Sequence, residues 1–178
     1  MQKWQLAPLP IEGVVALVNG WGDKPRQSSG ENEEPYPVPD TVGLGGNAAI
    51  EAATAAELVE VANRIHSVFA SSDASEFARL LEHLVEDVGL TLRFATAGEE
   101  VREIWTIGDP SRKILAAATL SLVHRLRDVP DVRRLGVCTA DDCVDVFADA
   151  SPAGRRRYCT VTCQNRIRAR TYRASRRP

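Results

Sequence analysis

Four cysteines near the C-terminal end of the chain constrain its fold more than any other feature. They are spaced Cys138-x4-Cys143 and Cys159-x3-Cys163, so all four fall within 26 residues. Two pairs of thiolates at such spacings are typical of a structural zinc site, in which four sulfur ligands close a tetrahedral shell and leave no position for a catalytic water. We expect one structural Zn2+ here, with the first pair on a turn and the second at the start of a helix.

Two disulfides, or unrelated buried thiols, are the alternatives to a zinc site. Residues 1–10 show neither the basic start, nor the apolar stretch, nor the small-residue cleavage site of an export signal. We therefore expect the protein in the reducing cytoplasm, where disulfides are rare. No apolar run approaches the length of about 20 residues that a membrane-spanning helix requires, so we expect no membrane partner.

The segment around the cysteines has a small apolar core. Its large apolar side chains are few, with Val137, Val146, Phe147, Tyr158 and Ile167 the main ones. A module of this size rarely folds on hydrophobic burial alone. Structural zinc contributes on the order of 10 kcal/mol, so removal of the ion should unfold the segment.

The charge of the chain is divided unevenly along its length. The net charge is −2, but residues 1–130 hold 11 basic and 19 acidic residues, whereas residues 131–178 hold 11 basic and 5 acidic ones. From Gly154 onward there are nine arginines and no acidic residue. Such a basic segment favours a polyanionic partner, above all a nucleic acid.

Residues 1–130 carry the pattern of a compact α+β domain. We expect a buried strand over residues 13–18, a Gly- and Pro-rich loop over 19–47 and a helix over 54–70 that opens with a capping box. A second helix should end at Gly89, and a hairpin over 90–107 should form the surface on which these helices pack. A third helix should run from Asp109 to Pro130.

The run from Cys138 to Arg173 resembles the CGNR zinc finger family of bacterial proteins. The similarity rests on Asp142-Cys143, on Arg155-Arg156-Arg157-Tyr158-Cys159 and on Cys163-Gln164-Asn165-Arg166, where Gln164 stands in place of the family glycine. The resemblance implies a treble-clef-like finger over residues 131–178, preceded by an ABATE domain over residues 1–130. It also implies a stress-induced transcription regulator that binds DNA through the finger and senses a small-molecule effector through the ABATE domain.

The last helix is the expected DNA contact. If it begins near Cys159 and continues through Ala174, then Arg166, Arg170 and Arg173, with Arg177 further on, form one stripe. These arginines can contact phosphates or base edges in the major groove. Neutralisation of the zinc thiolates, or pairing with acidic residues, is the competing role for these arginines. DNA regulators are commonly dimers that match symmetric half-sites, so a homodimer is a further expectation. The expected DNA contacts are Arg155, Arg156, Arg157, Gln164, Asn165, Arg166, Arg170, Arg173 and Arg177.

Two other functions compete with the regulator: a protein-interaction adaptor that uses the basic finger, and an enzyme in residues 1–130. His66, His83 and His124 each fall within a helical pattern and have no nucleophile motif beside them, so we expect no catalytic residues. A pocket bordered by Trp21, Trp105 and the Pro-rich loop is the expected place for an effector.

Overall fold

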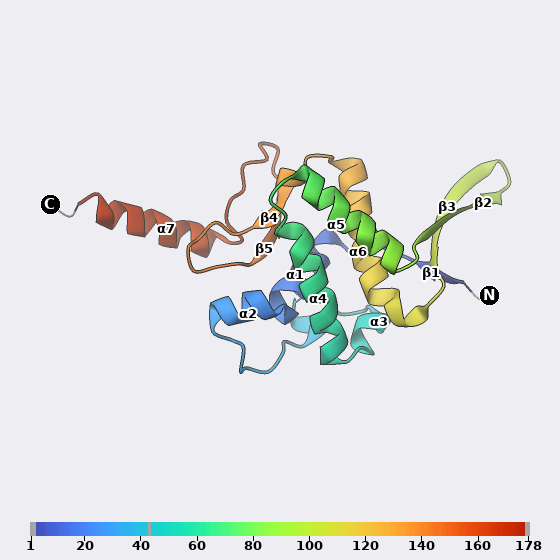
Figure 1. Ribbon diagram of the computed structural model, residues 1–178, viewed down its shortest axis with the longest axis horizontal. Helices are drawn as coiled ribbons and strands as arrows, with labels where there is room; N and C mark the ends of the chain where they lie inside the picture. The colour runs from blue at the N-terminus through green and yellow to red at the C-terminus, as the bar shows by residue number, and fades with distance from the viewer. Residues whose placement is uncertain (1–2, 43, 177–178) are drawn as a thin grey trace.

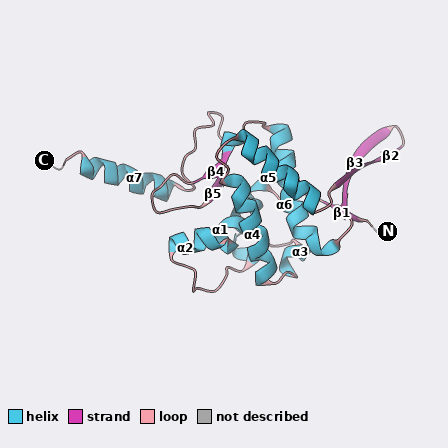
Figure 2. Ribbon diagram, in the orientation of Figure 1, coloured by secondary structure: helices cyan, strands magenta, loops and turns pink. Residues whose placement is uncertain are grey.

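Helices form the body of the molecule. The computed structural model describes residues 3–42 and 44–176. The main helices pack around one hydrophobic core, and two small antiparallel sheets are attached to it (Figures 1 and 2). The fold class is therefore mixed α and β, as the sequence predicts. The main helices are α1 (Ile11–Trp21), α4 (Ala55–Phe69), α5 (Ala74–Asp87) and α6 (Lys113–Asp128).

Helices α4 and α5 confirm the helices predicted from their caps. The Thr54 hydroxyl accepts a hydrogen bond from the Glu57 amide, and the Glu57 carboxylate accepts one from the Thr54 amide. The Asp73 carboxylate caps α5 by accepting hydrogen bonds from the amides of Ser75 and Glu76, and Gly89 beyond the end of α5 has a φ of +62°. Each cap satisfies amides at the start of a helix that would otherwise lack a partner.

The predicted third helix is also present. Asp109 accepts a hydrogen bond from the Ser111 amide and opens a short 3-10 turn, Pro110–Arg112, which leads into α6. Leu115, Ala118 and Leu122 on α6 are buried against the other helices. This helix therefore lies at the centre of the body.

The strand predicted over residues 13–18 is wrong, because this segment lies in helix α1. Val14, Leu17, Val18 and Trp21 are all fully buried, and their spacing is that of one helical face. A short apolar run fits a buried strand and a buried helix equally well. The periodicity extends to Trp21, and this longer stretch favours the helix.

The loop predicted over residues 19–47 is only partly a loop. Helix α2 (Asp23–Ser29) and a 3-10 turn at Pro39–Val42 occupy part of it, and the short helix α3 (Ala48–Glu51) follows. Buried Arg26 donates to the carbonyls of Glu31 and Glu34 and stacks on the Tyr36 ring, 4.6 Å from its centroid. One side chain thus organises a Pro-rich segment that has little secondary structure of its own.

The hairpin predicted over residues 90–107 is present, but only its base, with Trp105 and Ile107, packs on the helical core as expected. Strands β2 (Thr91–Ala97) and β3 (Glu100–Ile107) pair antiparallel, and β3 also pairs with β1 (Trp4–Leu6), which the sequence analysis missed. The hairpin extends away from the body (Figure 1), with Phe94 69% and Val101 67% exposed. The helices otherwise bury their apolar faces against one another.

The C-terminal segment consists of a second hairpin and one long helix. Strands β4 (Leu135–Val137) and β5 (Val146–Ala148) pair antiparallel, and α7 (Val161–Ala174) follows after a loop. Helix α7 and the β2–β3 hairpin extend from opposite ends of the molecule (Figure 1). No helix in the described ranges has both the length and the apolar character needed to cross a bilayer.

Candidate metal centre and basic helix

The four cysteines converge between the β4–β5 hairpin and the start of α7. Cys138 directly follows β4, and Cys143 lies three residues before β5. The four sulfur atoms all lie within 4.8 Å of one another. Two of the distances are short: Cys143 Sγ to Cys159 Sγ is 3.6 Å, and Cys159 Sγ to Cys163 Sγ is 3.5 Å.

This cluster fits one zinc ion. Zinc binds thiolate sulfur at about 2.3 Å, so two ligands of a regular tetrahedron lie about 3.8 Å apart. The two short distances approach this value, and all four cysteines are free of disulfides. Zinc would supply structural cross-linking here rather than hydrolytic chemistry, because four protein sulfurs complete its shell.

The surroundings of the thiols explain why a cation is needed to ionise them together. Burial raises the pKa of the Cys143 thiol to about 12 and also raises the pKa of Cys159. Burial acts in the same direction on Cys163, but hydrogen bonds from Thr160 and from the neighbouring thiols outweigh it and lower its pKa. Adjacent thiolates repel each other, and a divalent ion at their centre removes this repulsion.

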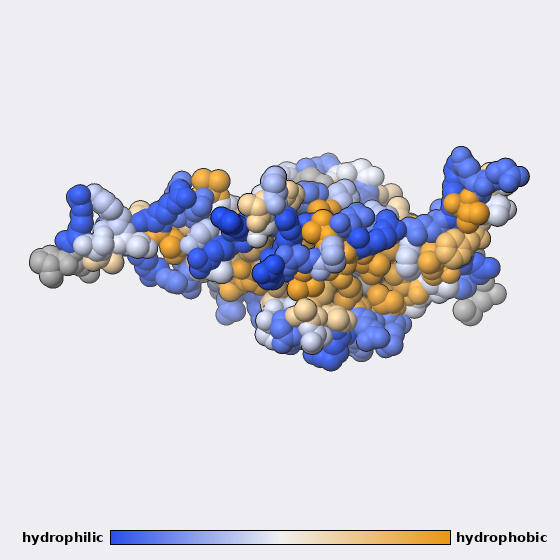
Figure 3. All heavy atoms as spheres, turned by 90° about the horizontal axis from the view of Figure 1, so that it is seen from above, coloured by the Kyte–Doolittle hydropathy of each residue, from blue (hydrophilic) through white to orange (hydrophobic). Residues whose placement is uncertain are grey.

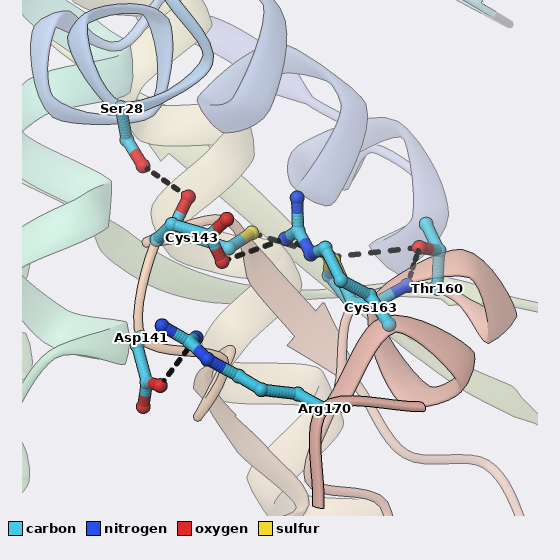
Figure 4. Close-up of polar contacts among 9 residues, drawn as sticks. Ser28, Asp141, Cys143, Thr160, Cys163 and Arg170 are labelled. Carbon is cyan, nitrogen blue, oxygen red and sulfur yellow. Dashed lines mark hydrogen bonds and ion pairs between the residues drawn. The ribbon is translucent and has the colours of Figure 1, made fainter. Parts of the chain in front are cut away.

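Helix α7 begins two residues later than the sequence suggested. Cys159 precedes the N-cap residue Thr160, whose hydroxyl accepts a hydrogen bond from the Cys163 amide at 3.2 Å. Cys163 is therefore the third residue of the helix, and Cys159 approaches the centre from the loop. The cap fixes the first turn of α7 at the sulfur cluster, as the Thr160 to Cys163 contact in Figure 4 shows.

Three side chains of the N-terminal helices hold the backbone that carries Cys143. Asn19 of α1 donates to the Val146 carbonyl at 3.1 Å and accepts from the Val146 amide at 2.8 Å. Nε2 of His66 on α4 lies 3.1 Å from the Val144 carbonyl. The Ser28 hydroxyl of α2 donates to the Asp142 carbonyl at 3.1 Å (Figure 4).

Sequence reasoning missed these three contacts and placed His66 only within a helical pattern. Each contact joins residues far apart in the chain, with sequence separations of 127, 78 and 114. No short motif signals a side chain that bonds a remote backbone. The only available signal was an Asn at the end of an apolar helical face, where a polar residue has to find a partner.

The loop between β5 and α7 is folded around Asp149. Its buried carboxylate accepts hydrogen bonds from the amides of Ser151 and Arg156, and bonds from these two residues lower its pKa to about 2. The Arg156 guanidinium donates to the carbonyls of Ala148, Tyr158 and Cys159. Arg156, expected at the DNA, is therefore occupied with holding the loop.

The structure pairs two other expected DNA contacts with acidic residues of the zinc loop. Arg166 lies 3.0 Å from Asp142, and Arg170 lies 2.7 Å from Asp141 (Figure 4). This is the competing role considered for the arginines, although the acidic partners come from the finger and not from residues 1–130. These pairs are exposed, so they contribute little to stability and leave the arginines accessible.

The remaining expected contacts lie on the surface. Gln164 is half-buried and lines a groove of about 420 Å3 together with the arginine cluster that precedes α7. Asn165 and Arg173 are exposed on the helix, and Arg177 lies outside the described residues. Arg168, which the sequence analysis did not include, is exposed on the opposite side of α7 from Arg170.

Residues 134–176 match the family model of the CGNR zinc finger. The CGNR zinc finger accordingly includes the β4–β5 hairpin, all four cysteines and α7. The match does not extend to residues 1–130, so the expected ABATE domain there stays a prediction. No curated protein matches the chain.

Of the residues considered for an enzyme, His66 contacts the backbone beside Cys143, whereas the two tryptophans considered for an effector pocket belong to the helical core or pack against it. Trp21 is buried in the helical core. Trp105 lies edge-on to His124, with ring centroids 6.2 Å apart. The expectation of no catalytic residues stays a prediction, and so does the expected homodimer.

Proposed function

We propose that the protein is a transcription regulator that binds DNA through its CGNR zinc finger, with α7 as the contacting element. The observation that carries the proposal is the exposure of α7. Of the described residues of this helix only Cys163 is buried, and the helix extends from the body with a largely hydrophilic surface (Figure 3). A helix that gains almost nothing from packing is available for another molecule.

The charges on α7 suit a groove in duplex DNA. Arg166, Arg170 and Arg173 share one side of the helix, while Arg168 lies on the other, because successive residues turn by about 100°. A helix in the major groove faces a phosphate backbone on each side. Arginines on both sides can therefore reach both strands at once.

The groove beside the start of α7 adds a second basic element. Arg155 and Arg157 line it and are exposed, and neither pairs with a carboxylate among the described residues. The loop that carries them is fixed by Asp149 and Arg156. Their guanidinium groups are thus held on a rigid support, as phosphate contacts require.

The salt dependence of DNA binding by the full chain tests the proposal. If about six arginines contact phosphates, log affinity should fall with log salt with a slope near −5. Arg173→Gln should reduce the slope by about 1 and leave zinc content unchanged. Arg102→Gln, on the distant β2–β3 hairpin, is the matched control and should change neither quantity. A slope near zero, or equal losses for the two variants, would contradict DNA binding through α7.

We also propose that residues 1–130 act as the effector-sensing part of this regulator. Support comes from cavities on the surface of the helical body, separate from the zinc finger. A protein-interaction adaptor remains the second candidate, favoured by the same exposed helix. If the partner is an acidic protein, α7 should bind it more tightly than duplex DNA. An experiment in which duplex DNA competes for α7 therefore distinguishes the two candidates.

A further inference from the structure

One cavity in the helical body has an apolar floor and a positively charged residue at its rim. It has a volume of about 310 Å3 and lies between strand β1, the short helix α3 and the first turns of α6. Its floor is apolar and includes the buried side chains of Leu6, Leu9, Ile50 and Ala117. This floor can therefore bury the apolar part of a ligand away from water.

The rim of this cavity is polar and carries one positive charge. Lys113, the first residue of α6, is exposed there and has no hydrogen-bond or ion-pair partner among the described residues. Asn47 uses its side-chain oxygen to accept from the Ala49 and Ile50 amides, which leaves its amide NH2 as a donor at the rim. Gln5 supplies a second exposed amide.

Among the residues that the structure describes, no acidic one lines this cavity, although residues 1–130 carry a net charge of −8. An adjacent cavity, which shares Ile114 of α6 with this one, is lined by Glu57 and Glu60 as well as Arg112. The nearest acid in sequence, Glu51, accepts a hydrogen bond from the Gly46 amide at 2.7 Å. An unpaired ammonium beside an acid-free apolar cavity selects for a ligand with one negative charge.

We propose that this cavity binds a small amphiphilic carboxylate, with the apolar chain on the floor and the carboxylate at Lys113. The volume is at the lower end of small-molecule sites, which suits a ligand of about ten non-hydrogen atoms. For such a ligand, a Kd on the order of 1 mM needs about 0.4 kcal/mol per non-hydrogen atom, which is within the limit for small ligands. This site would give the effector-sensing role proposed above a class of ligand. Only the biological consequence of binding, and not binding itself, depends on that role.

Calorimetric titration of the full chain with octanoate, and separately with 1-octanol, tests the charge requirement. Octanoate should bind more tightly than octanol, because only the acid pairs with Lys113. Lys113→Met should weaken octanoate binding about fivefold to tenfold and remove its advantage over octanol. Lys24→Met, on helix α2, is the matched control and should leave both affinities unchanged. Equal binding of the two ligands, or an unchanged affinity in Lys113→Met, would overturn the proposal.

The location of the site is tested separately. Ala48 is exposed at the cavity wall, so Ala48→Phe should fill the cavity without disturbing the core and should abolish octanoate binding. In amide NMR spectra, octanoate should shift the signals of Ala48 and Ala117 and leave those of α7 in place. Shifts confined to other surfaces, or no saturable binding at millimolar octanoate, would overturn the proposal. Because no DNA is present, these outcomes are independent of the salt-dependence test.

Discussion

The two halves of the zinc finger are held in the structure by different forces. The first half, the β4–β5 hairpin with Cys138 and Cys143, packs on helices α1 and α4, and its Val146 is fully buried in the main core. The second half, from Cys159 to the end of α7, buries little beyond its two sulfurs. Burial stabilises the first half, whereas the second half depends on the sulfur cluster.

This difference shows what the metal accomplishes in the fold. A hairpin that shares the core of the N-terminal helices needs no ion to form. Helix α7, with one buried residue in the described part of the chain, cannot form a stable helix of 14 residues on burial. A bound zinc ion would thus join a basic helix to a hairpin that packs on the body of the molecule.

Removal of zinc from the full chain should produce the largest effect. Because structural zinc contributes on the order of 10 kcal/mol, chelation should abolish amide protection throughout α7. The β4–β5 hairpin should remain protected, since Leu135 and Val146 stay in the main core. Hydrogen exchange resolved by segment measures both, and Cys163→Ser should reproduce the pattern.

Metal analysis provides the control for this experiment, because each sample must be shown to have lost its zinc. Equal loss of protection in α7 and the hairpin would mean that the whole finger is one zinc-dependent unit. Retained protection in α7 without zinc would remove the distinction between the halves.

Asn19→Ala should destabilise the first half specifically. The substitution leaves the amide and the carbonyl of Val146 without partners, which costs about 2–3 kcal/mol in a partly buried site. Urea unfolding should show this loss. Asn63→Ala is a matched control on helix α4, because Asn63 bonds the exposed Asp23 and should cost less. Equal losses for the two variants would show that Asn19 does not anchor the finger.

Much of the fold could be predicted from local signals. The N-caps at Thr54 and Asp109 and the terminating Gly89 predicted three helices, because capping depends on residues within one turn. The segment at residues 13–18 could not be assigned in the same way, since a short buried run lacks a distinguishing period. The position of the β2–β3 hairpin depends on how the helices pack together, which no local pattern records.

The metal centre was predictable because the identity and the spacing of its ligands can be read directly from the sequence. The side chains that hold it, Asn19, Ser28 and His66, were not, since their partners are remote backbone groups. The role of Arg156 could not be predicted for the same reason, because in the sequence this residue looks like part of a basic cluster. Only the folded loop shows that its donors are directed at carbonyl groups.

Thr160→Ala should weaken the second half and spare the first. Loss of an N-cap costs about 1 kcal/mol, so zinc affinity should fall about fivefold while the hairpin keeps its hydrogen-exchange protection. Thr162→Ala, two residues further along α7 at an exposed position, is the matched control and should change zinc affinity little. If both variants bind zinc like the original chain, the cap does not support the centre.

The smallest expected effect is a pH dependence that arises at His66. Burial lowers the pKa of His66 below its usual 6.5, and Lys24 adds to this, while the Val144 carbonyl and Asp145 oppose it. As the pH falls below 6.5, the unfolded chain therefore takes up a proton that the folded protein resists, and the free energy of unfolding decreases. In His66→Gln, whose amide can still donate to Val144, this part of the decrease should disappear. Urea unfolding at about pH 7.5 and about pH 5.5 compares the two chains. Protonation of the cysteines affects both alike, so an equal pH dependence would show that His66 titrates as it does in the unfolded chain.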